Sequence, residues 1–489
     1  MSKINIIGSG FSGLSASSYL AKAGHDVHIY EMHDMTGGRA RQFRNEGFTF
    51  DMGPSWYWMP DIFERFYQDF GYAAKDFYQL KRLDPSYQVF FENDVEDIPA
   101  NEDDLYAFFE RIETGSADKL RSFLKSAKYK YDVGINEFVE KPSLSPTEFL
   151  DIRILSSAMK LNMFSSLSKE VRTLFKNQKL IELLEFPVLF LGATPQKIPA
   201  MYSLMNYADL ILGTWYPMGG MYEIVKAMTE VAKSQGVNIH LNSKVEGIIS
   251  HGSLAQSLMI NGEHYGSDIT ISSADYHHTE QQLITSESLR NYSPKYWDKR
   301  VMAPSSLLFY IGVNRRLNNL KHHNLFFDKD FGIHAKEIYE DPQWPSDPLF
   351  YVCCPSQTDQ TVAPDGCENI FILMPLAPGI EDTESLRSQY FDLLMTRLEK
   401  RTGQQIKEHI VYKKSFCINN FKEDYHAFKG NAYGLANTLS QTAILKPRIK
   451  NRKLKNLYYT GQLTVPGPGV PPSIISGRVV ANQIISDLK

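Results

Sequence analysis

A glycine pattern near the start of the chain constrains its fold more than any other feature. Residues 8–13 read Gly-Ser-Gly-Phe-Ser-Gly, directly after the strand-like run Ile4–Ile7 and directly before a segment with an apolar helical face. In this pattern the first glycine permits a tight turn, the second lets backbone amides approach a pyrophosphate, and the third allows close helix–strand packing. The sequence therefore predicts a βαβ unit that binds a dinucleotide through Gly8, Ser9, Gly10, Phe11, Ser12 and Gly13.

A carboxylate follows at the spacing that such a unit needs. Val27–Tyr30 reads as the second strand, and Glu31 comes directly after it. An acidic side chain at this point accepts hydrogen bonds from ribose hydroxyls. Gly24 stands where the helix between the strands is expected to end, because glycine readily takes the left-handed conformation beyond a helix. The unit alone does not distinguish NAD from FAD.

The rest of the chain predicts an α/β protein of several parts. With 489 residues it is long enough for two or three structural units. Helical patterns cover about 102–130, 147–184, 222–235 and 473–488, and strand patterns cover 237–240, 245–249, 268–272, 307–313 and 370–374. This order predicts a nucleotide-binding domain assembled from residues 1–90, 216–290 and 441–489. A helical substrate region at 91–215 and a strand-rich substrate domain at 291–440 are expected between these segments.

Composition excludes several classes of function. The chain has 52 Lys and Arg against 56 Asp and Glu, a formal net charge of −4, so no broad electrostatic surface for nucleic acid is expected. Its four cysteines form no Cys-x-x-Cys pair, and His277-His278 and His322-His323 lack metal-ligand spacing, so we expect no metal site. The most apolar stretch, Leu183–Ala193, is too short to cross a bilayer. A reducing cytoplasm fits this cysteine usage.

Later loops combine glycine and proline with a few polar residues. Gly37-Gly38-Arg39 follows the second strand, and its two glycines would let Arg39 reach a phosphate or a flavin edge. Asp51–Pro54 comes next, and the tail Gly461–Pro472 precedes the last helix. Each segment taken singly is also what a tight turn would show, with Asp51 as a turn cap.

Together these segments resemble the FAD-dependent carotenoid desaturases of the bacterial phytoene desaturase type, which are relatives of the amine oxidases. The matching residues extend along the whole chain: Gly8–Gly13, Glu31, Gly37–Arg39, Asp51–Ser55, Trp215–Met221, Tyr459–Gln462, Gly467–Pro471 and Ser476–Gly477. The glycine loop is common to many flavoproteins, whereas residues 215–221 and the tail are more specific. Pro54–Pro60 is also similar to the phytoene desaturases of marine flavobacteria.

The resemblance implies a Rossmann-like domain of the amine oxidase and phytoene desaturase type, with non-covalent FAD as its cofactor. The residues implied to contact FAD, besides the glycine loop and Glu31, are Gly37, Gly38, Arg39, Gly53, Pro54, Ser55, Val245, Gly461, Gln462, Gly469, Val470 and Pro471. Gln462 departs from the family, in which a small or acidic residue often follows the glycine. The resemblance also implies Asp151 as a general base, with Arg153 beside it, although such a pair is commonly a solvated surface pair.

The implied reaction is the desaturation of a C40 carotenoid, most simply phytoene towards lycopene. Removing two hydrogens from adjacent carbons needs a hydride acceptor, a route for a proton and a long dry slot. The candidate aromatic residues for lining such a slot are Trp56, Tyr57, Trp58, Trp215 and Tyr216, although aromatic residues also fill cores. The alternatives are 3,4-desaturation of a hydroxylated carotenoid, isomerisation with reduced flavin, and a non-catalytic or transport flavoprotein. A nicotinamide dehydrogenase is a more distant alternative than these.

A carotenoid is almost absent from water, so the enzyme is expected to collect it from a bilayer. With no membrane-spanning segment in view, we expect docking on the cytoplasmic face of the cell membrane. The expected docking face is the helical region at about 155–205, with a helical membrane-facing part that includes Phe164, Leu167 and Phe186–Leu191. An amphipathic helix packed on a core would show the same pattern. The sequence does not indicate an oligomeric state.

Overall fold

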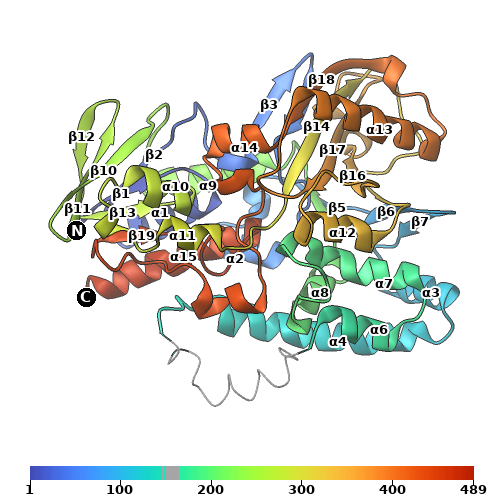
Figure 1. Ribbon diagram of the computed structural model, residues 1–489, viewed down its shortest axis with the longest axis horizontal. Helices are drawn as coiled ribbons and strands as arrows, with labels where there is room; N and C mark the ends of the chain where they lie inside the picture. Colours follow the sequence, from blue (N-terminus) through green and yellow to red (C-terminus); the bar gives the residue numbers. More distant parts are fainter. Residues whose placement is uncertain (146–147, 149–164) are drawn as a thin grey trace.

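The computed structural model describes residues 1–145, 148 and 165–489 (Figure 1). One part is a parallel sheet of five strands in the order β19–β13–β1–β2–β9. These are β1 (Lys3–Ile7), β2 (Asp26–Tyr30), β9 (Asn238–His240), β13 (Ile269–Ser272) and β19 (Leu457–Tyr459). The first strand lies between β2 and β13, so residues from both ends of the chain and from its middle meet in one sheet.

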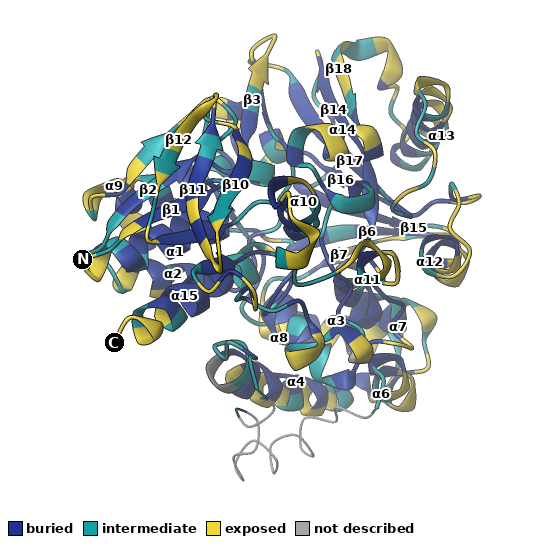
Figure 2. Ribbon diagram, turned by 60° about the vertical axis from the view of Figure 1, so that its left-hand side comes forward, coloured by how far each residue is buried: buried dark blue, intermediate teal, exposed yellow. Residues whose placement is uncertain are grey.

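Two long helices pack together beside this sheet. They are α1 (Phe11–Lys22) and α15 (Val470–Asp487), and α2 (Pro60–Gln68) and α9 (Tyr222–Ser234) accompany them. A Cβ at Gly477 in α15 would lie 2.4 Å from the carbonyl oxygen of Ser12, so only glycine permits this approach. Figure 2 shows α1 and the strands of the sheet largely in the colour of buried residues.

The last helix begins at Val470, three residues before the predicted start at Ser473. Pro471 and Pro472 therefore lie within its first turn. The amide hydrogens of a first turn have no partner inside the helix, so proline is well tolerated there. Pro471 and Pro472 therefore belong to the helix and not to the loop that precedes it.

A second, mixed sheet has seven strands in the order β18–β14–β17–β16–β15–β6–β7. They are β6 (Tyr87–Phe91), β7 (Val95–Ile98), β14 (Ser305–Val313), β15 (His323–Phe327), β16 (Phe350–Cys353), β17 (Glu368–Leu376) and β18 (Ile410–Phe416). Only β6 and β15 pair in parallel in this sheet. Leu394 and Leu398 of α13 (Glu384–Thr402) share a core with Phe309 of β14, so α13 covers one face.

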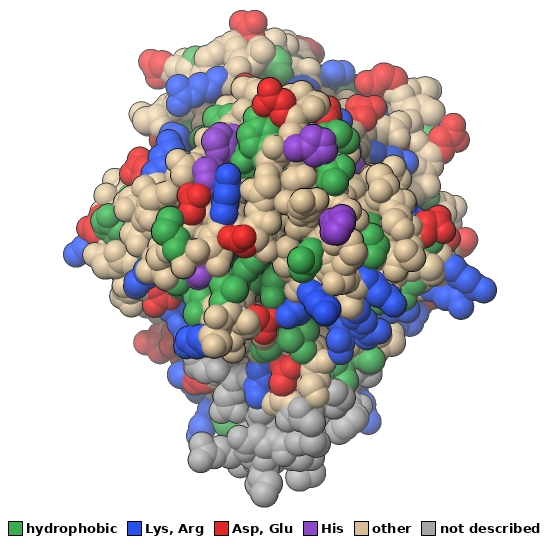
Figure 3. All heavy atoms as spheres, turned by 90° about the vertical axis from the view of Figure 1, so that its left-hand side faces the viewer, with side chains coloured by type: hydrophobic (Ala, Val, Ile, Leu, Met, Phe, Trp, Pro, Cys, Tyr) green, Lys and Arg blue, Asp and Glu red, His purple; other side chains and the backbone are tan. Residues whose placement is uncertain are grey.

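The smaller elements connect the two sheets. The strands are β3 (Gln42–Asn45) with β4 (Phe48–Asp51), β5 (Leu80–Arg82) with β8 (Trp215–Pro217), and the antiparallel β10 (Val245–His251), β11 (Leu254–Ile260) and β12 (Glu263–Gly266). The remaining helices here are α10 (Tyr276–His278), α11 (Pro294–Asp298), α12 (Phe331–Tyr339) and α14 (Ile418–Tyr425). Positive and negative side chains are interspersed over the face of the molecule that Figure 3 shows.

Helices form one end of the molecule, at the lower right of Figure 1. They are α3 (Glu102–Ile112), α4 (Ser116–Val133), α6 (Leu167–Leu174), α7 (Gln178–Glu185) and α8 (Leu204–Leu210). The helical pattern at 102–130 thus contains two helices, because Gly115 takes a left-handed φ of 78° between them. Positive φ is open to glycine and costly for other residues.

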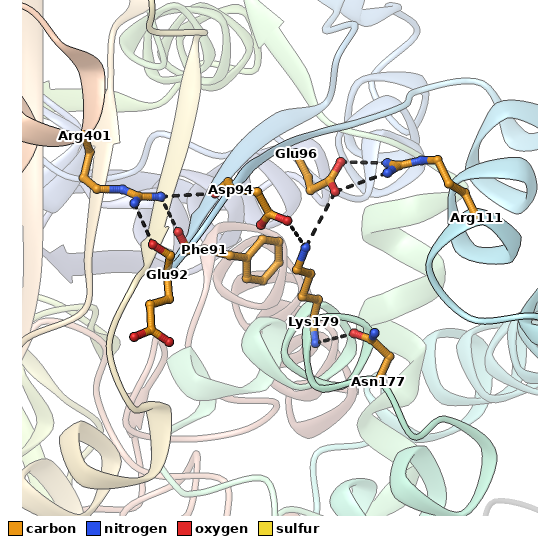
Figure 4. A network of polar contacts seen from close by, with 8 residues as sticks. All are labelled: Phe91, Glu92, Asp94, Glu96, Arg111, Asn177, Lys179 and Arg401. Atoms are coloured by element: carbon orange, nitrogen blue, oxygen red, sulfur yellow. Dashed lines mark hydrogen bonds and ion pairs between the residues drawn. The ribbon is translucent and has the colours of Figure 1, made fainter.

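Ion pairs join these helices to the seven-stranded sheet (Figure 4). Lys179 of α7 bonds to Asp94 and lies 3.8 Å from Glu96, in the turn and strand after β6. Arg111 of α3 donates to Glu96 at 2.7 Å. Arg401 of α13 donates to the carbonyl of Glu92 at 2.8 Å. Charged groups from three helices therefore converge on the β6–β7 hairpin.

The expected membrane-docking face is wrong for the part that the structure describes. Leu167 and Val188 are 0% exposed and Phe186 is 1% exposed, so these apolar side chains belong to the protein core. Phe164 and the rest of 149–164 lie outside the described residues. In the described parts of the chain, no helix has both the length and the apolar character needed to cross a membrane.

Candidate functional site

The glycine loop connects β1 to α1 and is open at its middle glycine. Gly8 has a φ of 91°, and a Cβ at Gly13 would lie only 2.3 Å from the carbonyl oxygen of Gly8. A Cβ at Gly10 would meet no protein atom within 4 Å. The outer glycines thus close the turn, while the space beside Gly10, at the start of α1, is free for a ligand.

Glu31 holds this loop in place. Its Oε2 accepts hydrogen bonds from the backbone N–H and the hydroxyl of Ser9, and its Oε1 accepts from the N–H of His33. The N–H of Ser243 donates to the backbone carbonyl of Glu31 at 2.7 Å, which brings the start of β10 at Val245 close to this corner. The structure therefore brings the predicted residues Ser9, Glu31 and Val245 together.

The second glycine pair lies directly over the first loop. The N–H of Gly37 donates to the carbonyl of Ser9 at 3.0 Å, and a Cβ at Gly38 would lie 3.5 Å from Cα of Gly10. A Cβ at Gly53 would lie 2.7 Å from the carbonyl oxygen of Arg39, so the chain leading to Pro54 and Ser55 also passes close by. These segments form one wall of a cradle around Gly10.

Arg39 lies beside this cradle and has one buried donor without an acceptor in the described residues. Its Nε is buried and donates to no acceptor in the described residues. With the side-chain amide of Gln462 turned so that its oxygen faces Arg39, this oxygen would accept from the two terminal nitrogens of Arg39 at 3.3 and 3.0 Å. The guanidinium lies 5.0 Å from the centre of the Tyr425 ring. Planar guanidinium groups suit phosphates and other anions. An orphaned donor beside an open glycine loop is the arrangement that a bound FAD would complete.

The tail supplies the opposite wall. The N–H of Gly461 donates to Oγ of Ser476, and a Cβ at Gly461 would lie 3.2 Å from Oγ of Ser12. Gly469 has a φ of 114° and precedes Val470 and Pro471, which open α15. The tail residues predicted from the resemblance therefore lie against the glycine loop or at the start of α15.

Asp51, which the sequence offers as a turn cap and as part of the matching segment Asp51–Ser55, makes long-range contacts. Its carboxylate accepts from the N–H groups of Met221 at 2.7 Å and Tyr222 at 3.2 Å, at the start of α9. Burial raises the pKa of Asp51 to about 6. Asp359 likewise accepts from the N–H of Gly219 at 2.6 Å. Two buried carboxylates thus fix residues 215–221 beside the cradle, and no local pattern indicated this.

Two cavities lie along the seven-stranded sheet. One, of about 450 Å³, contains polar groups such as Asp51, Ser55 and Tyr216. The other, of about 630 Å³, lies beside α12 and is almost entirely apolar. Its lining residues are Phe186, Leu189, Pro304, Leu325, Phe327, Phe331, His334, Ala335, Ile338, Tyr339, Leu349, Phe350, Tyr351, Leu373, Pro375 and Tyr433. Tyr57 and Trp58 are buried in the core, and neither lines these cavities.

The predicted histidine pair lies next to the polar cavity. His322 and His323 meet Cys353 with one ligand atom from each within 4.8 Å of the others. Burial lowers the pKa of His322 to about 3 and raises that of Cys353 to about 12. Trp56 stacks on His323 with ring centres 4.1 Å apart. The expectation of no metal site stays a prediction.

Comparison with known proteins places this geometry in a family. The flavin containing amine oxidoreductase family matches residues 11–485. The chain belongs to this family. A carotenoid 3,4-desaturase of Haloarcula japonica is 37% identical over 99% of this chain and 98% of its own length. A 4,4'-diapophytoene desaturase (4,4'-diaponeurosporene-forming) of Staphylococcus aureus is 31% identical over 100% of this chain and 99% of its own length.

Solved structures share the fold of this chain. An oxidoreductase from Methanosarcina mazei matches with a TM-score of 0.65 at 17% identity, covering 98% of this chain and 100% of its own. Putrescine oxidase matches with a TM-score of 0.59 at 14% identity, covering 99% of both chains. The predictions of an α/β flavoprotein fold, of FAD as cofactor and of an oxidoreductase are therefore confirmed. The predicted catalytic pair, Asp151 and Arg153, lies outside the described residues.

Proposed function

We propose that this enzyme uses FAD to desaturate a C40 carotenoid, phytoene towards lycopene. The observation that supports this most directly is the apolar cavity of about 630 Å³ along the seven-stranded sheet. Its lining is mostly aromatic and aliphatic, which suits a hydrocarbon chain. Similarity to two carotenoid desaturases along the whole chain supports the same class of substrate.

The proposed cofactor contacts follow the cradle. Gly8, Ser9, Gly10, Phe11, Ser12 and Gly13 would hold the pyrophosphate, Glu31 and Val245 the adenosine side, and Gly37, Gly38, Arg39, Gly53, Pro54, Ser55, Gly461, Gln462, Gly469, Val470 and Pro471 the remainder. The orphaned Nε of Arg39 and the open space beside Gly10 support this assignment. When bound, FAD would accept the two electrons of the desaturation.

This assignment carries a proposed division of the chain. Residues 1–90, 216–290 and 441–489 form the FAD-binding domain, and 91–215 and 291–440 form the substrate side with its helical insertion. The substrate would be drawn from the inner face of the cell membrane, where a hydrocarbon of this size dissolves. Flotation with anionic liposomes tests the docking, and protein that stays at the bottom of the gradient contradicts it.

The proposed general base is Asp151, with Arg153 beside it. Replacing Asp151 by Asn should lower the desaturation rate ~10²-fold, the usual contribution of general base catalysis. The control is Arg65→Met, which removes a charge from an exposed ion pair on α2. An unchanged rate in the Asp151 variant would remove this residue from the mechanism.

A second candidate substrate is a hydroxylated carotenoid desaturated at its 3,4 position. The observation that favours it is the 37% identity to a carotenoid 3,4-desaturase. The decisive experiment supplies the FAD-loaded protein with phytoene or with a 1'-hydroxylated carotenoid in liposomes and measures the product spectra. Turnover of phytoene supports the first proposal, turnover of the hydroxylated substrate alone supports the second, and isomerised product without loss of hydrogen contradicts both.

The cavity itself can be tested by filling it. Ala335 lies on α12 and lines the apolar cavity, and a tryptophan there would occupy much of the space. Ala335→Trp should lower kcat/KM at least tenfold while FAD content stays unchanged. Ala107→Trp, at an exposed position on α3, is the matched control. Equal kcat/KM in both variants would contradict a substrate site in this cavity.

A further inference from the structure

A buried lysine without a partner lies at the edge of the cofactor cradle. Lys446 is only 3% exposed, and its Nζ makes no hydrogen bond with any described residue. A buried ammonium group that lacks an anion or acceptor is strongly unfavourable, so such a lysine is neutral or faces a bound group. No predicted site residue explains it.

The side chain points at the tail turn. Lys446 follows η14 (Ala443–Leu445), and a Cβ at Gly467 would lie 3.2 Å from its Nζ. The same Cβ would lie 3.0 Å from Oδ1 of Asn437, which is 4% exposed and also has no partner among the described residues. Two unpartnered buried polar groups therefore converge on one residue of the turn.

This turn is part of the FAD cradle at its other end. Gly461 lies against Ser12 of the glycine loop, and Gln462 contacts Arg39. Gly467 follows Gly461 by six residues, and its Cβ position lies next to Nζ of Lys446. Lys446 thus lies beside the same turn that carries the cradle residues Gly461, Gln462 and Gly469.

The described segments next to Lys446 supply no countercharge. Residues 437–442 and the turn 461–469 carry no titratable side chain. The titratable groups that contact or adjoin these segments are Tyr202, whose hydroxyl lies 3.5 Å from Oγ1 of Thr442, and Arg448, which donates to the carbonyl of Leu144. Burial alone lowers the pKa of Lys446 to about 7. None of these groups would hold a proton on Lys446.

We propose that Lys446 is neutral beside oxidised FAD and takes up one proton when the bound FAD is reduced. Its ammonium then offsets the negative charge that two electrons and one proton leave on a flavin. Electrons and protons balance for a desaturation, because the two hydrogens lost by adjacent carbons amount to two electrons and two protons. A bound FAD would supply the acceptor for both electrons and one proton, and the proton that the general base removes would pass to Lys446.

The midpoint potential of the bound flavin tests this without any carotenoid, so a failure here is separate from a failure of the proposed function. A two-electron couple changes by about 30 mV per pH unit for each proton taken up. Wild type should show about 60 mV per pH unit over roughly two units above the lysine pKa of about 7. A wild-type slope of about 30 mV in this range overturns the proposal.

Variants identify the residue responsible. Lys446→Met should reduce the slope to about 30 mV per pH unit, and Lys446→Arg, which stays charged, should give the same slope with a higher potential than Lys446→Met. Lys453→Met, at an exposed position, should keep the wild-type slope. A purely structural role for Lys446 would not alter the number of protons. A wild-type slope in Lys446→Met therefore overturns the assignment.

Discussion

The carboxylate of Glu31 accepts two hydrogen bonds from one residue, Ser9, from its N–H at 2.8 Å and from its hydroxyl at 2.6 Å. This pair joins the end of β2 to the first turn after β1. It fixes the glycine loop before any ligand binds, because both donors of Ser9 are already satisfied. A preformed loop lowers the entropy that cofactor binding must overcome.

Replacing Gly10 by Val should leave the fold intact and abolish FAD binding. A Cβ at Gly10 would have no atom of the described residues within 4 Å beyond its own chain neighbours, so the added side chain would extend into the space beside the open loop. The measurement is flavin absorbance per protein together with circular dichroism. Gly266→Val is the matched control, since its Cβ also has room, with the nearest atom 3.8 Å away. Full flavin content in Gly10→Val would contradict the pyrophosphate assignment.

Replacing Arg39 by Met should weaken FAD binding by about 10- to 100-fold. The guanidinium has a buried Nε with no acceptor in the described residues, and a charge-assisted hydrogen bond contributes about 1.5–3 kcal/mol. Titration of apoprotein with FAD measures the change in Kd. Arg111→Met, which removes an exposed ion pair on α3, should leave Kd unchanged. Equal Kd values for both variants would exclude Arg39 from the cofactor site.

Replacing Gly477 by Ala should destabilise the protein by about 1–3 kcal/mol, the usual cost of overpacking. A Cβ there would lie 2.4 Å from the carbonyl oxygen of Ser12 and 2.6 Å from Cβ of Ser15, so α15 would have to move away from α1. Thermal unfolding measures the loss, and Gly266→Ala is the control. An unchanged thermal unfolding midpoint in Gly477→Ala would contradict the close packing of α15 against α1.

Replacing Asp209 by Asn should raise stability at alkaline pH. Burial raises the pKa of Asp209 from 3.8 to about 7, and Tyr87 donates a hydrogen bond to it. Between these values the folded state binds more protons than the unfolded state, so stability falls as pH rises through this window. The gain in midpoint of Asp209→Asn should therefore be larger at pH 8 than at pH 4. Exposed Asp365→Asn is the control, and a pH-independent gain would contradict the ionisation account.

The sequence predicted the parts of the site that depend on local spacing. The strand, the glycine loop, the helix and Glu31 lie within thirty-one residues, and each is specified by its neighbours in the chain. The bond between Asp51 and Met221 joins residues 170 positions apart, so no local pattern contains it. Lys446 likewise carries no local signal, because its burial depends on Gly467 and Asn437 folding around it. The apolar face at Leu167 was misread because core and membrane select the same residues.

Oxidation of a carotenoid should reduce the bound flavin. The most direct measurement is an anaerobic single turnover, in which FAD-loaded protein is mixed with excess phytoene in liposomes and followed by absorbance. Flavin absorbance should bleach while longer-wavelength polyene absorbance appears, with one new double bond for each flavin reduced. Polyene change without bleaching, or no bleaching at all with either phytoene or a hydroxylated carotenoid, would contradict it.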